Sequence, residues 1–199
     1  MAFGNKKKSA NYISAKESRA ISRQNRKITN ELEKKRNRKH IPESEYITQM
    51  KNADNCVEFD NVHTYFFTDI GTVKSVDGVS FDVPQGKTVG IVGESGCGKS
   101  VTSQSILRLY DEKRLAVYSG EVRFEGKNLF DLSEKEMQDI RGEKISMVFQ
   151  DALSSLNPVF TVGNQIMESL MIHRKISKQE AKNRAIEMLG LVGIPDPQR

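Results

Sequence analysis

The chain has 199 residues, with 31 lysines and arginines against 26 aspartates and glutamates, so its formal net charge is +5. Hydrophobic residues make up 37% and charged residues 29% of the chain, a balance typical of a soluble globular protein of one ordinary domain, which excludes a large multidomain enzyme. No apolar run approaches the roughly 18 residues of a membrane-spanning helix, and two cysteines cannot build a disulfide framework, which excludes an integral membrane protein and a secreted cystine knot.

The positive charge is concentrated in residues 1–52. This segment carries 14 Lys/Arg and 5 Asp/Glu, a local charge of +9, whereas the remainder carries 17 and 21, a charge of −4. A thin apolar stripe at helical spacing predicts a helix within Lys16–Lys39, which we expect Pro42 to end. The residues of this stripe are Ile21, Ile28 and Leu32.

Three interpretations of residues 1–52 stay open. Composition favours a solvated extension, partly helical or disordered. The same charge would suit an electrostatic tether to anionic lipid. The third interpretation is an arm that binds nucleic acid. The only aromatic residues interleaved with the charges are Tyr12 and Tyr46, so base stacking has little support.

From Cys56 onward the sequence alternates strand and helix signals. The apolar, β-branched runs predict five strands: Val57–Phe67, Val76–Val83, Thr88–Val92, Glu121–Phe124 and Ile145–Phe149. A turn is expected at Asp69–Gly71, between the first two. Thr88–Val92 is short and apolar throughout, a pattern typical of a strand buried on both faces.

Four helices are predicted between or after these strands: Ser100–Tyr110, Ser133–Arg141, Ile166–His173 and Ser177–Val192. Two of them begin with capping-box spacing, Ser133 with Glu136 and Ser177 with Glu180. Gly193 stands where a C-terminal cap belongs. In the last helix, one face is shared by Ala181, Ala185, Met188, Leu189 and Val192. Strands mixed with helices indicate an α/β fold over residues 53–199, beyond the N-terminal extension 1–52.

The most informative segment is the run Gly93-Glu94-Ser95-Gly96-Cys97-Gly98-Lys99-Ser100. It matches G-x-x-x-x-G-K-[ST], the phosphate-binding P-loop, and lies between a predicted strand and a predicted helix. Glycine permits the dihedral angles that turn backbone N–H groups inward around a phosphate, and the helix start adds the positive end of its dipole. Lys99 would reach the β- and γ-phosphates, and the Ser100 hydroxyl would bind Mg²⁺. Val101 completes the predicted nucleotide contacts.

The P-loop and two later motifs resemble the nucleotide-binding subunit of an ABC transporter. These motifs are Ser119-Gly120-Glu121 before a strand and Val148-Phe149-Gln150-Asp151, whose Phe149-Gln150 position matches the Q-loop. The oligopeptide/dipeptide importer subfamily is the more specific resemblance. It rests on Val76–Phe81, Gly98–Thr102, Ser155-Leu156-Asn157-Pro158, Thr161-Val162-Gly163 and Gln165-Ile166. The resemblance extends from Cys56 to Arg199 and implies a P-loop NTPase fold with an antiparallel β subdomain and the start of a helical subdomain.

The resemblance also implies roles for single residues. Gln150 would bind Mg²⁺ or the attacking water through its amide oxygen and couple the site to a membrane partner. An aromatic side chain before the second strand would stack on adenine. Tyr65, Phe66 and Phe67 all compete for this role, with Phe66 the first choice and Tyr65 the next. Cys97 is interpreted as a spacer and His173 as a surface histidine.

Several parts of a complete ABC ATPase are absent from these 199 residues. We find no Ser-Gly-Gly signature, no Walker B strand followed by a glutamate and no switch histidine. The expectation is therefore an incomplete domain that binds Mg-ATP but hydrolyses it negligibly alone, because Lys99, Ser100 and Gln150 supply no general base. A missing Walker B strand would also leave an apolar sheet edge that is prone to aggregation.

By resemblance, the complete subunit would lie on the cytoplasmic face of the membrane. Its partners would be ATP, transmembrane permease subunits, a second ATP-binding subunit and, indirectly, an extracellular solute-binding protein. The transported solute, a peptide, nickel or another small solute, stays open. The alternatives are another P-loop NTPase and a non-transport ABC protein whose basic arm binds nucleic acid, although nucleic acid is the less favoured partner.

Overall fold

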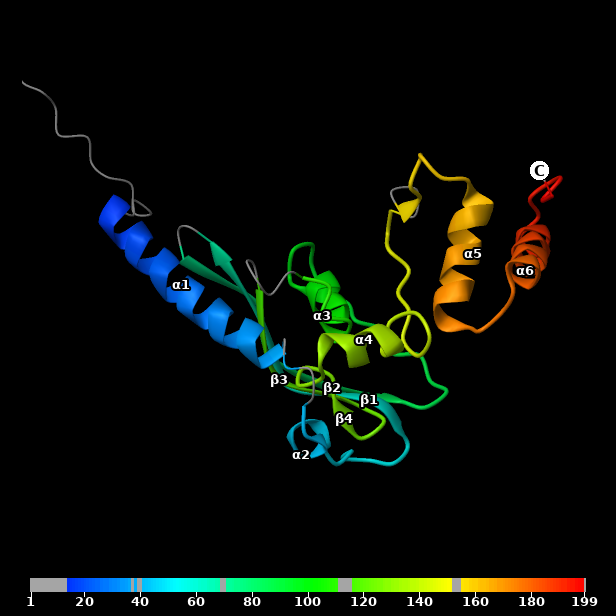
Figure 1. Ribbon diagram of the computed structural model, residues 1–199. Helices are drawn as coiled ribbons and strands as arrows, with labels where there is room; N and C mark the ends of the chain where they lie inside the picture. The colour runs from blue at the N-terminus through cyan, green and yellow to red at the C-terminus, as the bar shows by residue number, and fades with distance from the viewer. Residues whose placement is uncertain are drawn as a thin grey trace, which may run out of the picture. The chain divides into compact units, whose positions relative to one another are not determined.

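The computed structural model describes residues 14–36, 38, 41–68, 71–110, 116–151 and 155–198 (Figure 1). Tyr12 and the first two residues of the expected turn at Asp69–Gly71 lie outside these ranges. The chain divides into two compact units, Met1–Met137 and Gln138–Arg199, and α4 (Glu134–Ile140) spans the boundary between them. None of the described helices is both long enough and apolar enough to cross a bilayer.

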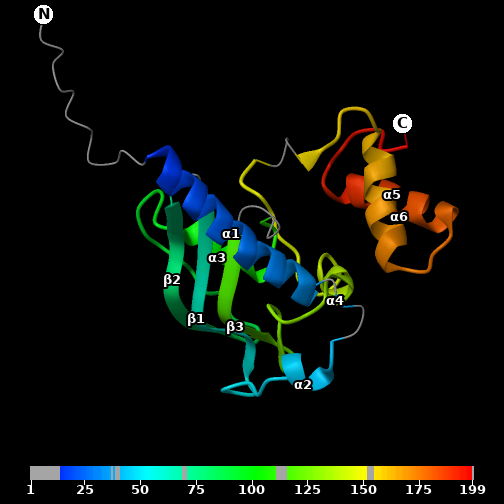
Figure 2. The same cartoon turned by 60° about the vertical axis from the view of Figure 1, so that its left-hand side comes forward.

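The first unit is built on an antiparallel sheet in which the strands lie in the order β2-β1-β3-β4, and Figure 2 labels the first three of them. These strands are β1 (Asn55–Thr68), β2 (Gly71–Pro84), β3 (Ala116–Phe124) and β4 (Lys127–Asn128). The predicted strands Val57–Phe67, Val76–Val83 and Glu121–Phe124 are confirmed as β1, β2 and β3. Each observed strand is longer than the apolar run that predicted it. The added residues extend the backbone ladder, which does not require apolar side chains.

The core of this unit lies on one face of the sheet. Val62 on β1 and Val122 on β3 are fully buried, and Phe59 stacks on Phe81 across β1 and β2 with ring centroids 4.2 Å apart. Beyond the strands, Leu129 and Leu132 are also buried. Each side chain removed from water in this way stabilises the fold by about 1.5–3 kcal/mol.

A bulge bends β1 where it passes Gly120. The register between β1 and β3 shifts between Asp60 and His63, and Asn61 takes a left-handed conformation with φ of 47°. Gly120 has φ of +84°, and a Cβ atom there would collide with the Asn61 carbonyl oxygen. Glycine at this position is therefore required by both the backbone conformation and the close approach of the two strands.

Residues before β1 are held to the sheet by a buried carboxylate, Glu58, which is fully inaccessible. Its oxygens accept hydrogen bonds from the backbone N–H groups of Lys51 (2.8 Å) and Asn52 (2.9 Å) and from the Asn55 side chain (2.8 Å). Burial alone would raise the pKa of Glu58, but these three bonds, with the Arg123 guanidinium, outweigh it and lower the pKa. The carboxylate is therefore ionised and fixes the turn that enters the sheet.

The N-terminal helix α1 covers Ala15–Arg36 and confirms the helix predicted in the basic segment. Ser14 and Glu17 form a capping box at its start, with the Glu17 N–H 3.3 Å from the Ser14 hydroxyl oxygen. The predicted end was wrong, because α1 stops at Arg36. Pro42 instead occupies the N-cap position of the next helix, α2 (Glu43–Tyr46), and makes no side-chain capping bond.

The second unit contains α5 (Val162–His173) and α6 (Lys178–Leu191), which pack against each other. Ser177 and Glu180 form the predicted capping box of α6, and Gly193 ends it with φ of +80°. On the face that the spacing predicts, Ala181 and Ala185 are buried. Met188 and Val192, from the same predicted face, are 44% and 73% exposed.

Two predicted strands, Thr88–Val92 and Ile145–Phe149, are not strands in the structure. Val92 is 92% exposed, so the burial on both faces that was expected of Thr88–Val92 is also wrong, and Val148 in the other segment is 93% exposed. The physical reason is pairing: within the described ranges no strand pairs with either segment, and Ile145 forms only an isolated bridge with Arg141. An extended backbone without a strand partner leaves most of its N–H and C=O groups to water. The apolar sequence alone cannot supply that partner.

Candidate functional site

The P-loop connects the extended segment Thr88–Val92 to α3 (Lys99–Ile106) in the first unit. α3 confirms the predicted helix but ends earlier, because Arg108 adopts a left-handed φ of 49°. The Lys99 ammonium folds back over the loop. It donates hydrogen bonds to the carbonyl oxygens of Gly93 (2.8 Å) and Glu94 (2.6 Å) and lies 3.7 Å from the Cys97 sulfur. The Lys99 ammonium therefore links the end of the P-loop to its beginning.

Two glycines make this loop possible. Gly98 is the N-cap of α3 in the left-handed region, with φ of 93°, and a Cβ atom there would collide with the carbonyl oxygen of Ser75 on β2. At Gly93, a Cβ atom would lie 2.8 Å from the Cys97 sulfur. Both positions therefore need glycine for close approach, and Gly98 also for its dihedral angle.

Helix α3 is anchored to the sheet by buried hydroxyl groups. The Thr64 hydroxyl on β1 lies 2.7 Å from the Ser105 hydroxyl, which also lies 2.6 Å from the Val101 carbonyl oxygen. Thr102 donates to the Gly98 carbonyl through both its N–H (2.8 Å) and its hydroxyl (3.0 Å). Sequence reasoning missed Thr64 and Ser105, since no periodicity or spacing marks a hydroxyl pair that joins distant segments. Their effect is to fix the last turn of α3 against β1.

The start of α3 offers donors to an anion. Gly98 provides no side-chain cap, and among the described residues no side chain bonds to the first-turn N–H groups of the helix. Such groups, together with the helix dipole and the Lys99 ammonium, form an environment that attracts phosphate oxygens. Among the described residues, no group of three or more His, Cys, Asp or Glu side chains could hold a metal ion. The exposed Ser100 hydroxyl fits Mg²⁺, which usually takes few protein ligands and completes its shell with phosphate and water.

Tyr65, the second choice for adenine stacking, is engaged in a polar cluster. Its hydroxyl donates to the Asp77 carboxylate, and His63 Nδ1 lies 2.9 Å from the same carboxylate. The bond from Tyr65 lowers the pKa of Asp77, and the same bond raises the pKa of Tyr65. The Lys74 ammonium lies 5.1 Å from the Tyr65 ring centroid. One face of this ring is therefore already covered by a cation.

Phe66, the first choice for adenine stacking, lies next to Tyr65 on β1 and is partly exposed. Its ring meets Tyr110 edge to face, with centroids 4.8 Å apart and an interplanar angle of 90°. The Tyr110 hydroxyl in turn bonds to Gln104 on α3. Phe66 is thus linked through one aromatic neighbour to the helix that begins at the P-loop, and its stacking role stays a prediction.

Gln150, the predicted Q-loop residue, is exposed and belongs to the second unit. Its role therefore stays a prediction from resemblance.

The residues that carry the importer resemblance after Gln150, from Ser155 to Ile166, are held together by local hydrogen bonds. The Gln165 side chain accepts from the Asn157 N–H (2.9 Å) and donates to the carbonyl oxygens of Asn157 and Phe160 (3.0 Å each). The Thr161 hydroxyl caps α5 by accepting from the Asn164 N–H.

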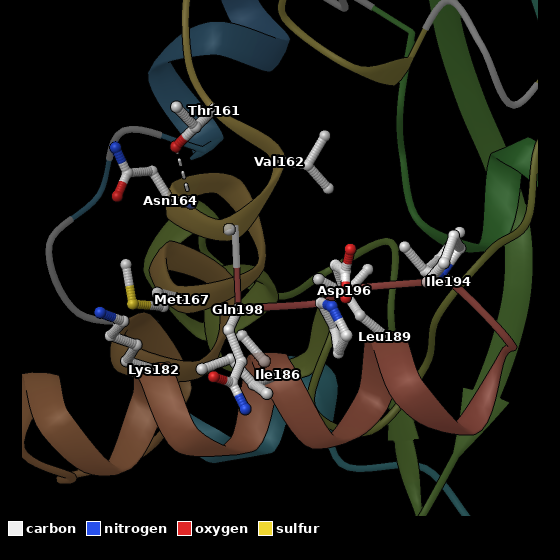
Figure 3. Close-up of a pocket in the computed structure, with 14 residues that line it drawn as sticks. Thr161, Val162, Asn164, Met167, Lys182, Ile186, Leu189, Ile194, Asp196 and Gln198 are labelled. Carbon is white, nitrogen blue, oxygen red and sulfur yellow. Dashed lines mark hydrogen bonds between the residues drawn. The ribbon is translucent and has the colours of Figure 1, made fainter.

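The second unit also contains a hollow of about 640 Å³ between α5, α6 and the residues after α6 (Figure 3). Met167, Ile186 and Leu189 are among the apolar side chains that line it, and Lys182 and Asp196 are its charged ones. The hollow contains no P-loop residue.

His173, at the end of α5, packs against the backbone of Gly142, where a Cβ atom would lie 2.8 Å from the His173 Nε2 atom.

Comparison with known families decides the identity of the fold. The model of the ABC transporter family matches residues 76–199, more than half of the chain. The chain belongs to the ABC transporter family. This result confirms the predicted fold class, an ABC-type P-loop domain with an antiparallel β subdomain, and the P-loop described above lies within the matched residues.

Curated relatives show which members of the ABC transporter family this chain resembles. The dipeptide transport ATP-binding protein DppD of Bacillus subtilis (strain 168) is 54% identical over 137 residues, which are 69% of this chain and 41% of the relative. The oligopeptide transport ATP-binding protein OppD of the same organism is 54% identical over 129 residues, 65% of this chain and 36% of the relative. The predicted resemblance to peptide importers is confirmed, and the chain spans less than half the length of these relatives.

Solved structures agree with this family. The dimeric structure of MJ0796, a bacterial ABC transporter cassette, superimposes with a TM-score of 0.58 at 27% identity, covering 68% of this chain and 56% of the cassette. A post-hydrolysis state of the same cassette, bound to ADP and Pi, gives a TM-score of 0.58 at 28% identity with the same coverage. Both similarities support an ABC ATPase fold for the described region.

Proposed function

We propose that this chain binds Mg-ATP through its P-loop and forms the N-terminal part of the ATP-binding subunit of an ABC importer for peptides or similar small solutes. The observation that carries the proposal is the start of α3, where Gly98 leaves the first-turn N–H groups without a side-chain cap and Lys99 lies over the loop. The names of the relatives, which are dipeptide and oligopeptide transport ATP-binding proteins, support the substrate class.

The proposed binding step exchanges partners around Lys99. In the structure its ammonium donates to two neutral loop carbonyls, and we expect negatively charged triphosphate oxygens to take their place as acceptors. Hydrogen bonds between charged groups are roughly twice as strong as neutral ones, so the exchange favours nucleotide. The N–H groups of Lys99, Ser100 and Val101 would donate to the phosphates, and glycines 93, 96 and 98 with Glu94, Ser95 and Cys97 would form the surrounding loop.

Magnesium would neutralise part of the triphosphate charge, and the Ser100 hydroxyl would hold it with phosphate oxygens. Gln150 would contribute its amide oxygen to the same ion or to a water molecule. Phe66 remains the first choice for stacking on adenine, with Tyr65 second, because the Tyr65 ring is already covered by Lys74. These roles are extensions of the P-loop proposal to residues outside the loop.

Assembly follows from the same proposal. The complete subunit would pair with a second ATP-binding subunit, dock on two transmembrane permease subunits at the cytoplasmic face of the membrane and depend indirectly on a solute-binding protein. Copurification of the chain with tagged permease subunits of a peptide importer would test this part. Its absence, with ATP binding intact, would leave an ABC ATPase without a transport partner.

Calorimetric titration with Mg-ATP tests the binding proposal itself. We expect saturable binding by the native chain and a loss of at least about tenfold in affinity for Lys99→Ala, because one charge-assisted contact is removed. Lys87→Ala, an exposed lysine outside the loop, is the matched control and should bind as the native chain does. Equal affinity in all three proteins would contradict the proposal, and turnover that Lys99→Ala abolishes would refute the expectation of binding without hydrolysis.

A further inference from the structure

Helix α1 lies outside the residues that the family model matches, which begin at residue 76. Neither the P-loop nor the proposed ATP binding gives this helix a role. Its 22 residues contain no aromatic side chain, and lysine and arginine outnumber acidic residues in it. The helix is therefore a feature of this chain that needs its own explanation.

One face of α1 is already in use. Ile21, Asn25 and Ile28 are half-buried, and Thr29 is only 6% exposed. These residues recur at helical spacing and so form a single stripe along the helix. Figure 2 shows α1 running beside β1 and β3 of the same unit. This half-buried stripe is consequently not free to enter the interior of a membrane.

The opposite face is strongly basic. At 100° per residue, six exposed cations project from this side, in a band about 27 Å long. They are Lys16, Arg19, Arg23, Arg26, Lys27 and Lys34. Within the described part of the chain, no ion pair involves any of the six. The face, which we call the basic face of α1, is thus a row of cations directed at solvent.

We propose that the basic face of α1 binds the anionic headgroups of a lipid bilayer, with the helix lying parallel to the membrane surface. A straight row of cations on one side of a helix matches a plane of negative charge, and each Lys or Arg near such a surface adds a favourable increment. The choice of a membrane rests in part on the proposed function, which places the subunit beside permease proteins.

Nucleic acid fits the same charge less well. Single-stranded RNA or DNA is bound largely by stacking on aromatic rings, and α1 has none. A recognition helix in the major groove of DNA is enclosed by both walls of the groove, whereas α1 can offer only the side away from its half-buried stripe. The bilayer is therefore the occupant that the geometry favours.

Vesicle binding by the full chain tests this proposal. The variant Arg19→Gln/Arg23→Gln/Lys27→Gln removes three cations from the basic face and keeps good helix formers. The control Lys178→Gln/Lys182→Gln/Arg184→Gln removes the same charge from α6. Cosedimentation is measured with phosphatidylcholine vesicles that contain or lack phosphatidylglycerol, and circular dichroism verifies that helix content is retained.

We expect the native chain and the α6 control to bind vesicles only when phosphatidylglycerol is present, and to release them in high salt. The basic-face variant should bind on the order of 100-fold more weakly, as the loss of three interfacial cations implies. Equal binding by the two triple variants would overturn the proposal, because net charge alone would then explain it. Tighter binding of an RNA or DNA oligonucleotide, lost in the basic-face variant, would also overturn it.

The Lys99→Ala variant separates this proposal from the proposed function. The basic face and the P-loop share no residue, so Lys99→Ala should bind anionic vesicles as the native chain does while losing Mg-ATP. Conversely, the basic-face variant should keep its affinity for Mg-ATP. A vesicle affinity that falls in Lys99→Ala as far as in the basic-face variant would contradict a role for α1.

Discussion

Strands β1 to β3 and the segment Thr88–Val92 have similar apolar, β-branched sequences and adopt different states. The three strands pair with one another and bury Val62 and Val122 completely, whereas Val92 is 92% exposed and no strand pairs with its segment in the described structure. The difference teaches that apolar sequence specifies a strand only where a neighbour accepts its backbone hydrogen bonds. Helices α5 and α6 need no such neighbour, since their backbone bonds are internal.

The largest difference in unfolding free energy should come from comparing two glycine substitutions, one in the sheet and one in Thr88–Val92. Gly120→Ala, in the sheet, forces a side chain into a left-handed backbone and against the Asn61 carbonyl, and should cost roughly 3 kcal/mol of unfolding free energy. Gly90→Ala, in Thr88–Val92, has open space around its Cβ position and should change stability by less than about 0.5 kcal/mol. Urea denaturation followed by circular dichroism measures both. Similar losses in the two variants would erase the distinction between the regions.

Removing methyl groups should give the next largest contrast. Val122→Ala leaves a cavity in the core and should destabilise the fold by about 2 kcal/mol. Val92→Ala and Val148→Ala remove groups that already face solvent, so each should lie within about 0.5 kcal/mol of the native chain. Thermal unfolding in parallel samples provides the comparison. A cost at Val92 equal to that at Val122 would mean that this segment is packed in solution.

Acid should weaken the sheet through Glu58. Its pKa is lowered in the folded chain, so its stabilisation is present above the unfolded pKa and is lost as the pH falls through the folded pKa. We expect Glu58→Gln to cost about 2 kcal/mol at neutral pH, and the difference from the native chain to shrink below about pH 4.3. Glu168→Gln, exposed on α5, is the control. Unfolding free energies over a pH series test this, and a gap that widens in acid would refute it.

The smallest loss of stability is expected in α6, a helix whose backbone hydrogen bonds need no partner strand. Ser177→Ala removes the capping box of α6 and should cost about 1 kcal/mol. Ser169→Ala, inside α5 and exposed, is the matched control and should be neutral or slightly stabilising. Helix content against temperature is the measurement. An unchanged melting curve for Ser177→Ala would show that packing, not the cap, decides where α6 begins.

The sequence predicted best those features that local chemistry determines. The P-loop follows from glycine and lysine spacing, and the capping boxes follow from Ser-x-x-Glu. The misplaced strands Thr88–Val92 and Ile145–Phe149 depended on pairing partners, which no short window of sequence reveals. The buried carboxylate of Glu58 and the hydroxyl pair Thr64–Ser105 were also beyond prediction, because each is satisfied by groups that only the fold brings together.

Protection of Cys97 tests most directly the central claim, that the P-loop holds ATP. The chain has two cysteines, both exposed, so Cys56→Ser leaves Cys97 as the single reactive thiol within the loop. We predict that Mg-ATP slows alkylation of Cys97 by about tenfold or more at saturation, and that this protection disappears when Lys99→Ala is added. Alkylation at the same rate with and without Mg-ATP, at concentrations that saturate the calorimetric titration, would contradict the claim.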